Sequence, residues 1–157
     1  IYVLYAFRRL EKSYRFAFSA VLTLVHDVVL VTGIYALLGH IFGLQVNSVF
    51  IVALLTVIGY SVNDTIVIFD RIRENQIKFP DNKYSSNINI SINESIIRSL
   101  GTSITTLLVL FSMLILGGST LREFIVVLIL GVVVGTYSSI FIASQFLIIW
   151  EEGIKKD

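Results

Sequence analysis

The chain has 157 residues, of which 55% are hydrophobic and only 15% are charged, and its mean hydropathy is +0.85. An average globular chain has about 25% charged residues, so this composition excludes a water-soluble globule. The net charge of +1 excludes a typical basic nucleic-acid-binding protein. The absence of cysteine excludes disulfides, thiolate metal sites and a thiol nucleophile.

The uncharged segments are long enough to cross a bilayer. A membrane-spanning helix needs about 20 predominantly apolar residues to cross about 30 Å of hydrocarbon. Between Ala17 and Phe69 the only charged residues are Asp27 and Asp64, and a polar turn that begins near Gly39 divides this segment. The sequence predicts an all-α, polytopic transmembrane helix bundle with four complete spans, at about residues 17–38, 49–69, 99–116 and 124–150.

The positive charges predict the orientation of the bundle, because cytoplasmic loops of membrane proteins carry most of the Lys and Arg residues. Four of the 12 precede the first complete span, five lie between the second and third spans, and two follow the last span. Only Arg122 lies on the other side. We therefore predict a cytoplasmic C-terminus, and we interpret residues 1–7 as the tail of an earlier, fifth span.

The connection between the second and third spans is the only sizeable polar segment. The second helix is predicted to continue into water until Pro80 and Asn82 end it. Ser91 and Glu94 have the spacing of a capping box, which predicts a surface helix that begins there and leads into the third span. The alternating isoleucines of residues 88–92 leave a short strand as an open alternative.

Asp64 is the main candidate for a functional residue. A carboxylate within a spanning helix costs about 2.5–3.5 kcal/mol on the insertion scale, so it is expected to be functional or paired. Burial favours the neutral form of a carboxyl group and a nearby cation favours the ionised form, so a group between these influences can load and release a proton. The candidate cation is Arg98, which enters the membrane from the same side. Tyr60, Asn63 and Thr102 are the supporting polar residues.

Structural interpretations of several intramembrane residues remain open. Arg98 would also serve as an anchor that reaches the lipid head groups. Asp27 is either a second proton carrier or, with His26, a hydrogen-bonded structural pair between helices. Gly131 and Gly135 have the small-xxx-small spacing that predicts close helix packing. The sequence contains no nucleophile elbow, phosphate loop or metal-ligand cluster, so we predict no enzymatic activity, cofactor or metal.

The segment at residues 57–75, VIGYSVNDTIVIFDRIREN, closely resembles the SecF signature of the SecD/SecF family of protein-export membrane proteins. Supporting similarities lie at residues 26–27, 98–106 and 131–139, so the resemblance covers nearly the whole chain. It implies that residues 1–157 form the C-terminal transmembrane region of such a protein. This region is half of a membrane domain of the resistance-nodulation-division type.

The same resemblance implies a function in the bacterial cytoplasmic (inner) membrane. Together with SecD, such a subunit draws on the proton gradient to help preproteins through the SecYEG channel. By position, Asp64 resembles the proton-linked carboxylate and Arg98 its basic partner, while Asp27 matches a family motif. A proton-coupled exporter of small molecules or lipids from the same superfamily and a passive assembly scaffold remain alternatives. The sequence does not decide between proton and sodium as the coupling ion.

Overall fold

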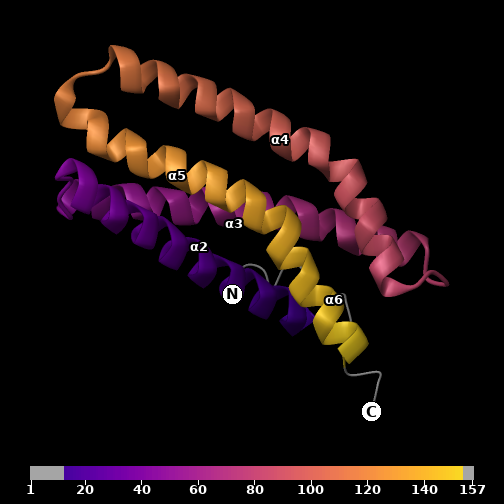
Figure 1. Ribbon diagram of the computed structural model, residues 1–157. Helices are drawn as coiled ribbons and strands as arrows, with labels where there is room; N and C mark the ends of the chain where they lie inside the picture. The colour runs from indigo at the N-terminus through magenta and orange to yellow at the C-terminus, as the bar shows by residue number, and fades with distance from the viewer. Residues whose placement is uncertain (1–12, 154–157) are drawn as a thin grey trace.

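The computed structural model describes residues 13–153, and all of its regular elements are helices. The all-α prediction is therefore confirmed for this part of the chain. The predicted tail of an earlier span, residues 1–7, lies outside the described residues. The elements in chain order are α2 (Ser13–Phe42), α3 (Ser48–Lys78), α4 (Tyr84–Leu116), the short 3-10 helix η1 (Ser119–Leu121), α5 (Arg122–Ser138), the π-helical turn η2 (Ser139–Ala143) and α6 (Ser144–Gly153) (Figure 1).

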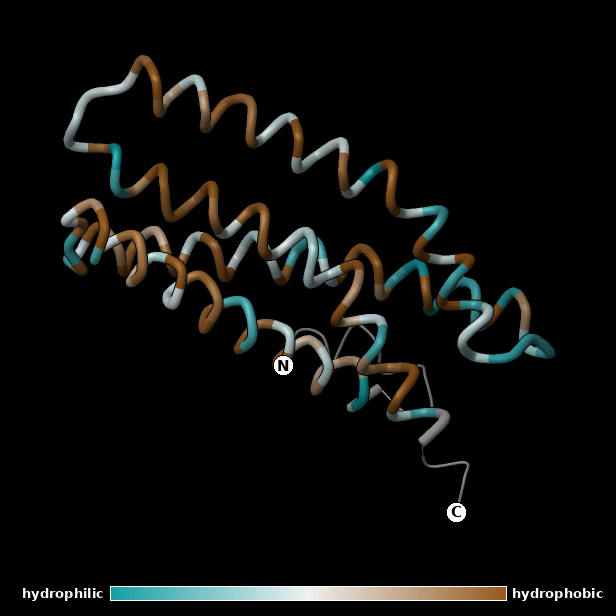
Figure 2. Tube along the Cα trace, viewed as in Figure 1, coloured by the Kyte–Doolittle hydropathy of each residue, from teal (hydrophilic) through white to brown (hydrophobic). Residues whose placement is uncertain are grey.

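Four helical segments of the described chain are long and apolar enough to cross a membrane: residues 14–42, 48–78, 84–116 and 119–151. The last of these combines η1, α5, η2 and α6. Large apolar side chains face outward, with Leu37 68%, Ile97 82% and Leu116 85% exposed. Hydrophilic residues gather at the end of the bundle where α3 connects to α4 (Figure 2). An apolar exterior with polar ends is the arrangement that a bilayer requires.

Helix α3 packs against α2, α4 and α5. Its contact with α5 is close because α5 presents glycines there. A Cβ added to Gly131 would overlap the side chain of Val57, and one added to Gly135 would lie 3.2 Å from Cβ of Ser61. The close helix packing predicted from the glycine spacing is therefore present, and it joins α5 to α3.

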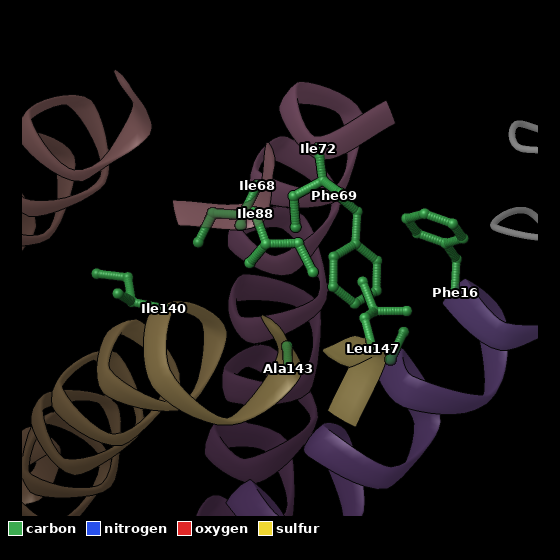
Figure 3. Packing of buried hydrophobic residues seen from close by; sticks show 9 residues of the cluster. Phe16, Ile68, Phe69, Ile72, Ile88, Ile140, Ala143 and Leu147 are labelled. Carbon is green, nitrogen blue, oxygen red and sulfur yellow. The ribbon is translucent and has the colours of Figure 1, made fainter. Parts of the chain in front are cut away.

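A cluster of buried apolar residues holds the helices together at the end where α6 terminates. Phe69 of α3 is fully buried and meets Phe16 of α2 edge to face, with ring centroids 5.4 Å apart. Leu147 of α6 and Ile72 of α3 belong to the same cluster. Figure 3 shows Leu147 and Phe16 lying beside the Phe69 ring. This cluster brings the first and last described helices together around α3.

The turn between α2 and α3 is built from two specific residues. Gly43 has φ of +73°, a left-handed conformation that favours glycine just after a helix. Asn47 caps α3 by accepting hydrogen bonds from the backbone N–H groups of Val49 and Phe50, at 3.0 and 3.1 Å. Its amide nitrogen also donates to Glu123 Oε2 at 3.0 Å, which links this turn to the start of α5.

The segment that connects α3 to α4 differs from the prediction in its second half, where a new helix was expected to begin at Ser91. Helix α4 begins at Tyr84, its N-cap Lys83 makes no capping hydrogen bond through its side chain, and the helix continues without a break to Leu116. The predicted capping box is therefore wrong, as is the alternative of a strand. Ser91 is fully buried within α4, and its hydroxyl lies between Asn87 O at 2.7 Å and Asn75 Nδ2 at 2.9 Å. Ser91 therefore joins α4 to α3 and does not cap a helix.

Asn75 is the centre of this helix hairpin, so its removal should loosen the hairpin. It is 2% exposed, and its amide nitrogen lies 2.9 Å from both Ser91 Oγ and Glu94 Oε2. We expect Asn75→Ala to cost about 1–3 kcal/mol, because the buried hydroxyl of Ser91 loses its hydrogen bond to Asn75. The effect is measured as a lower Tm and faster proteolysis of the 79–83 turn. The exposed Asn93 is the control, and equal effects of Asn93→Ala and Asn75→Ala would contradict this role.

Candidate functional site

Asp64 lies on the face of α3 that packs against α4, and its side chain is buried, with the residue 8% exposed. Ser99 of α4 donates to the carboxylate, with Oγ 2.7 Å from Oδ1 and 2.9 Å from Oδ2. A buried carboxylate is tolerated only when hydrogen bonds or charges compensate for the lost water. Ser99 supplies that compensation.

A cavity of about 110 Å³ opens beside Asp64. One water occupies about 30 Å³ in the liquid and needs two to four polar partners, so this cavity is large and polar enough to hold water. Asp64, Arg98 and the three supporting residues predicted from the sequence all contribute to its wall. The lining residues are Tyr60, Asn63, Asp64, Val67, Arg98, Ser99 and Thr102.

Arg98 faces this cavity from α4 but does not touch the carboxylate. It is exposed, and it forms no salt bridge with Asp64 or with any other carboxylate of residues 13–153. The structure therefore brings the predicted acid and base to one cavity without a direct ion pair. The hydroxyl of Thr102 bonds to backbone carbonyls of its own helix, including that of Arg98 at 3.2 Å.

Asp27 lies outside this cavity, in a different contact between helices. It is 1% exposed, and its Oδ2 accepts hydrogen bonds from Ser61 of α3 and, at 2.7 Å, from Ser138 of α5. His26 Nδ1 lies 3.1 Å from Oδ1. The two residues therefore form the predicted hydrogen-bonded pair at a contact between helices, while a role of Asp27 as a proton carrier stays a prediction. The serines of α3 and α5 are the residues that join Asp27 to its neighbouring helices.

Further hydroxyl groups connect the helices around the two carboxylates. Thr65 Oγ1 lies 2.8 Å from Ser139 Oγ in the π-helical turn. Ser103 Oγ lies 3.1 Å from Tyr60 Oη and 2.5 Å from Thr136 Oγ1. A π-helical turn inside an α-helix often marks a functional site, and here it follows directly after Ser138, which bonds to Asp27.

A pattern in the sequence indicates some of these hydroxyl contacts. Serines recur every fourth residue in α4, at Ser91, Ser95, Ser99 and Ser103, and all four are buried, with exposures of 0–6%. Residues four apart lie on the same face of a helix. This serine stripe therefore predicts a polar contact along one side of α4, which in the structure is the side that meets α3 and α5.

Polar and small residues also reach the outer surface near the cavity. Asn63 is exposed on α3, and Arg98 and Thr102 are exposed on α4. We call these residues, together with Thr56, Gly59 and Thr105, the polar strip; all six are exposed. Exposed polar groups are unfavourable against hydrocarbon, so the polar strip is better suited to contact with another protein than with lipid.

Comparisons with known proteins identify the family. Residues 1–153 match the family model described as protein export membrane protein SecD/SecF, C-terminal. The chain belongs to the SecD/SecF family. The resemblance seen at residues 57–75 is thereby confirmed, and the four apolar helices are those of a multi-pass membrane protein of this family.

Members of this family show how much of a full-length protein the chain represents. Protein translocase subunit SecF of Thermobaculum terrenum is 45% identical, over 96% of this chain and 47% of that protein. Protein translocase subunit SecDF of Thermus thermophilus is 44% identical, over 88% of this chain and 18% of that protein. The chain thus spans about half the length of the SecF relatives.

The fold agrees with solved structures of the same family. The crystal structure of SecDF in the super-membrane-facing form superposes with a TM-score of 0.88 at 42% identity, covering 99% of this chain and 20% of that one. This agreement confirms the predicted fold class, a polytopic helix bundle of the type found in SecDF.

Proposed function

We propose that this chain is the C-terminal membrane region of a protein-export subunit that, together with SecD, couples the proton gradient to preprotein translocation through the SecYEG channel. Asp64 carries the proposal, because it is a buried carboxylate that opens onto a polar cavity within the membrane-spanning part of the bundle. The relatives named as translocase subunits SecF and SecDF support the export function.

The geometry suggests how protonation of Asp64 moves the helices. When a hydronium ion in the cavity gives its proton to the carboxylate and becomes water, Asp64 becomes neutral and no longer attracts Arg98, whose guanidinium stays protonated. When Asp64 releases the proton, the attraction between α3 and α4 returns. Moving one charge through 100 mV supplies about 2.3 kcal/mol, which is sufficient to change the relative stability of two helix arrangements.

The polar strip is the surface that we assign to SecD. It places Asn63, Arg98 and Thr102 on the outside of α3 and α4, next to the cavity, where a second membrane subunit would cover them. Relatives named SecDF carry both names in one protein, which supports the association. A partner on this surface would close the cavity on its open side and exclude lipid from it.

The proposal includes an orientation in the bacterial cytoplasmic membrane. We assign the C-terminus to the cytoplasm, because cytoplasmic segments carry most Lys and Arg residues and these concentrate at the end of the bundle where α3 connects to α4. The chain works by helix movement driven by the gradient, without enzymatic chemistry or a cofactor.

The test is export by the full-length protein with SecD and SecYEG in proteoliposomes. Proton and sodium gradients are imposed separately, and translocated preprotein is measured. We expect the proton gradient to stimulate export and the sodium gradient alone to leave it unchanged. Equal export with and without both gradients would leave only a scaffold role, and stimulation by sodium alone would assign a different ion.

Arg98 offers a graded test of the same site. We expect Arg98→Ala to reduce gradient-stimulated export about tenfold or more, and Arg98→Lys to be milder, because lysine keeps the charge but loses the two-point geometry of the guanidinium. Export stimulated by the proton gradient is the measurement. Arg122→Ala is the control, since Arg122 is exposed at the opposite end of the bundle. Wild-type export by both Arg98 variants would reduce Arg98 to a lipid anchor.

A further inference from the structure

One face of α2 carries buried polar residues from its first turn to its middle. Arg15, Ser19, Thr23 and Asp27 recur at every fourth residue, with exposures of 6%, 0%, 0% and 1%. Residues with this spacing lie along one side of a helix. We call these four residues the α2 seam. Helix α2 begins at the end of the bundle where α6 terminates (Figure 1), so the α2 seam runs from that end toward Asp27.

The hydrogen bonds of the α2 seam are incomplete at Ser19. Its hydroxyl is completely buried and has no hydrogen-bond partner among the described residues. Thr23 bonds to the backbone carbonyl of Ser19 at 2.9 Å, within the same helix. Buried hydroxyls are nearly always satisfied by protein or by bound water. An unpaired hydroxyl one turn from Thr23 and two turns from Asp27 therefore indicates a position for water.

A buried ion pair stands at the outer end of the α2 seam. Arg15 of α2 is paired with Glu151 of α6, and the two side chains are only 7% and 13% exposed. The pair joins the start of the first described helix to the last turns of α6. A charged pair can close by pairing and open by separating, so its position at the end of the α2 seam suits it to act as a gate.

We propose that the α2 seam is a water-filled access route through which Asp27 exchanges protons with the end of the bundle that carries Arg15 and Glu151, with that ion pair as its gate. The proposal extends the proposed function, because it gives Asp27 a route separate from the cavity beside Asp64. In the transfer step, a hydronium ion in the α2 seam gives its proton to the Asp27 carboxylate. The hydronium becomes water and the carboxylate becomes a neutral carboxyl group.

Protonation of Asp27 would alter the contacts between helices, because its hydrogen-bond donors lie on different helices. The groups that face the carboxylate are His26 from its own helix and the hydroxyls of Ser61 from α3 and Ser138 from α5. Both hydroxyls donate to the same carboxylate oxygen. Protonation of that oxygen displaces at least one donor, and this weakens the connection of α2 to α3 or α5.

Cysteine labelling tests the route directly, because the chain contains no cysteine of its own. Ser19→Cys, Thr23→Cys and Ala20→Cys are introduced singly into the full-length protein in membrane vesicles of both orientations. The reagent is a cationic methanethiosulfonate, which reacts with thiols that water reaches. Ala20 is the matched control, because it lies beside Ser19 on the same helix, is 8% exposed and belongs to the apolar cluster.

We expect Ser19→Cys and Thr23→Cys to react at least tenfold faster than Ala20→Cys, and only from the side that carries Arg15. Opening the gate with Glu151→Gln should increase the rate at Ser19→Cys several-fold further. Rates equal to that of Ala20→Cys, with and without Glu151→Gln, would overturn the route. Fast labelling that Glu151→Gln leaves unchanged would overturn the gate.

The outcome is independent of the role of Asp64, because labelling requires no export. If the α2 seam is unreactive while Asp64→Asn still abolishes gradient-driven export, the route is wrong and the proposed function stands. If the α2 seam is labelled as expected while Asp64→Asn exports normally, the proposed coupling through Asp64 is wrong and the water route remains.

Discussion

Asp64→Asn is expected to abolish export stimulated by the proton gradient while the protein still inserts into the membrane and binds SecD. Asparagine has nearly the same volume as aspartate and keeps a carbonyl oxygen that accepts the hydrogen bond from Ser99. It cannot bind and release a proton near neutral pH. The substitution therefore removes the chemistry of the site and leaves its packing in place. The measurement is translocated preprotein with and without an imposed gradient.

The matched control for this substitution is Asp70→Asn. Asp70 lies on the same helix but is exposed, where it is in contact with Arg73 at 3.4 Å. Exposed ion pairs of this kind contribute about 0–1 kcal/mol, so wild-type export is expected. Gradient-stimulated export that survives in Asp64→Asn, or is lost equally in Asp70→Asn, would contradict the role assigned to Asp64.

Gly131→Ala is expected to have the largest effect on stability. The added Cβ would overlap the side chain of Val57, and this contact lies where α5 packs closely on α3. Inserting a carbon into a tightly packed contact costs about 1–3 kcal/mol. Ser138, which bonds to Asp27, lies on the same helix as Gly131, so export should fall together with stability. The measurements are the Tm of the detergent-solubilised protein and its export activity.

Two further variants make this prediction specific. A Cβ at Gly33 of α2 meets nothing within 4 Å, so Gly33→Ala should leave the Tm equal or higher, because alanine is the better helix former. Combining Gly131→Ala with Val57→Ala removes the overlapping side chain and should restore part of the loss. A Tm for Gly131→Ala equal to that of Gly33→Ala would contradict the close packing of α5 on α3.

The helices were predictable because membrane insertion imposes a simple rule on sequence. Uncharged segments of sufficient length must form helices that satisfy their own backbone groups. The start of α4 was not predictable in the same way. Ser91 and Glu94 fit a local capping pattern, but both meet Asn75 of α3 in the structure, Ser91 as a fully buried residue. A contact between residues far apart in the chain thus outweighed a short local motif.

The candidate site was predictable in its members but not in its geometry. Intramembrane charges are costly, so Asp64 and Asp27 stand out in an apolar sequence, and Arg98 enters from the same side as Asp64. That Asp64 and Arg98 share a cavity without forming an ion pair depends on how α3 and α4 pack. The pairing of Ser99 with Asp64 and of Ser138 with Asp27 likewise depends on helix packing, which no spacing within one helix predicts.

Infrared difference spectroscopy of the full-length protein tests the central claim most directly, since it detects whether Asp64 changes its ionisation state. Spectra of the wild type and of Asp64→Asn are recorded across physiological pH, and the carboxyl C=O band lost in the variant is assigned to Asp64. We predict that this band grows as the pH falls and diminishes as it rises. A band of constant intensity over the whole range, or no band at any pH, would contradict proton coupling through Asp64.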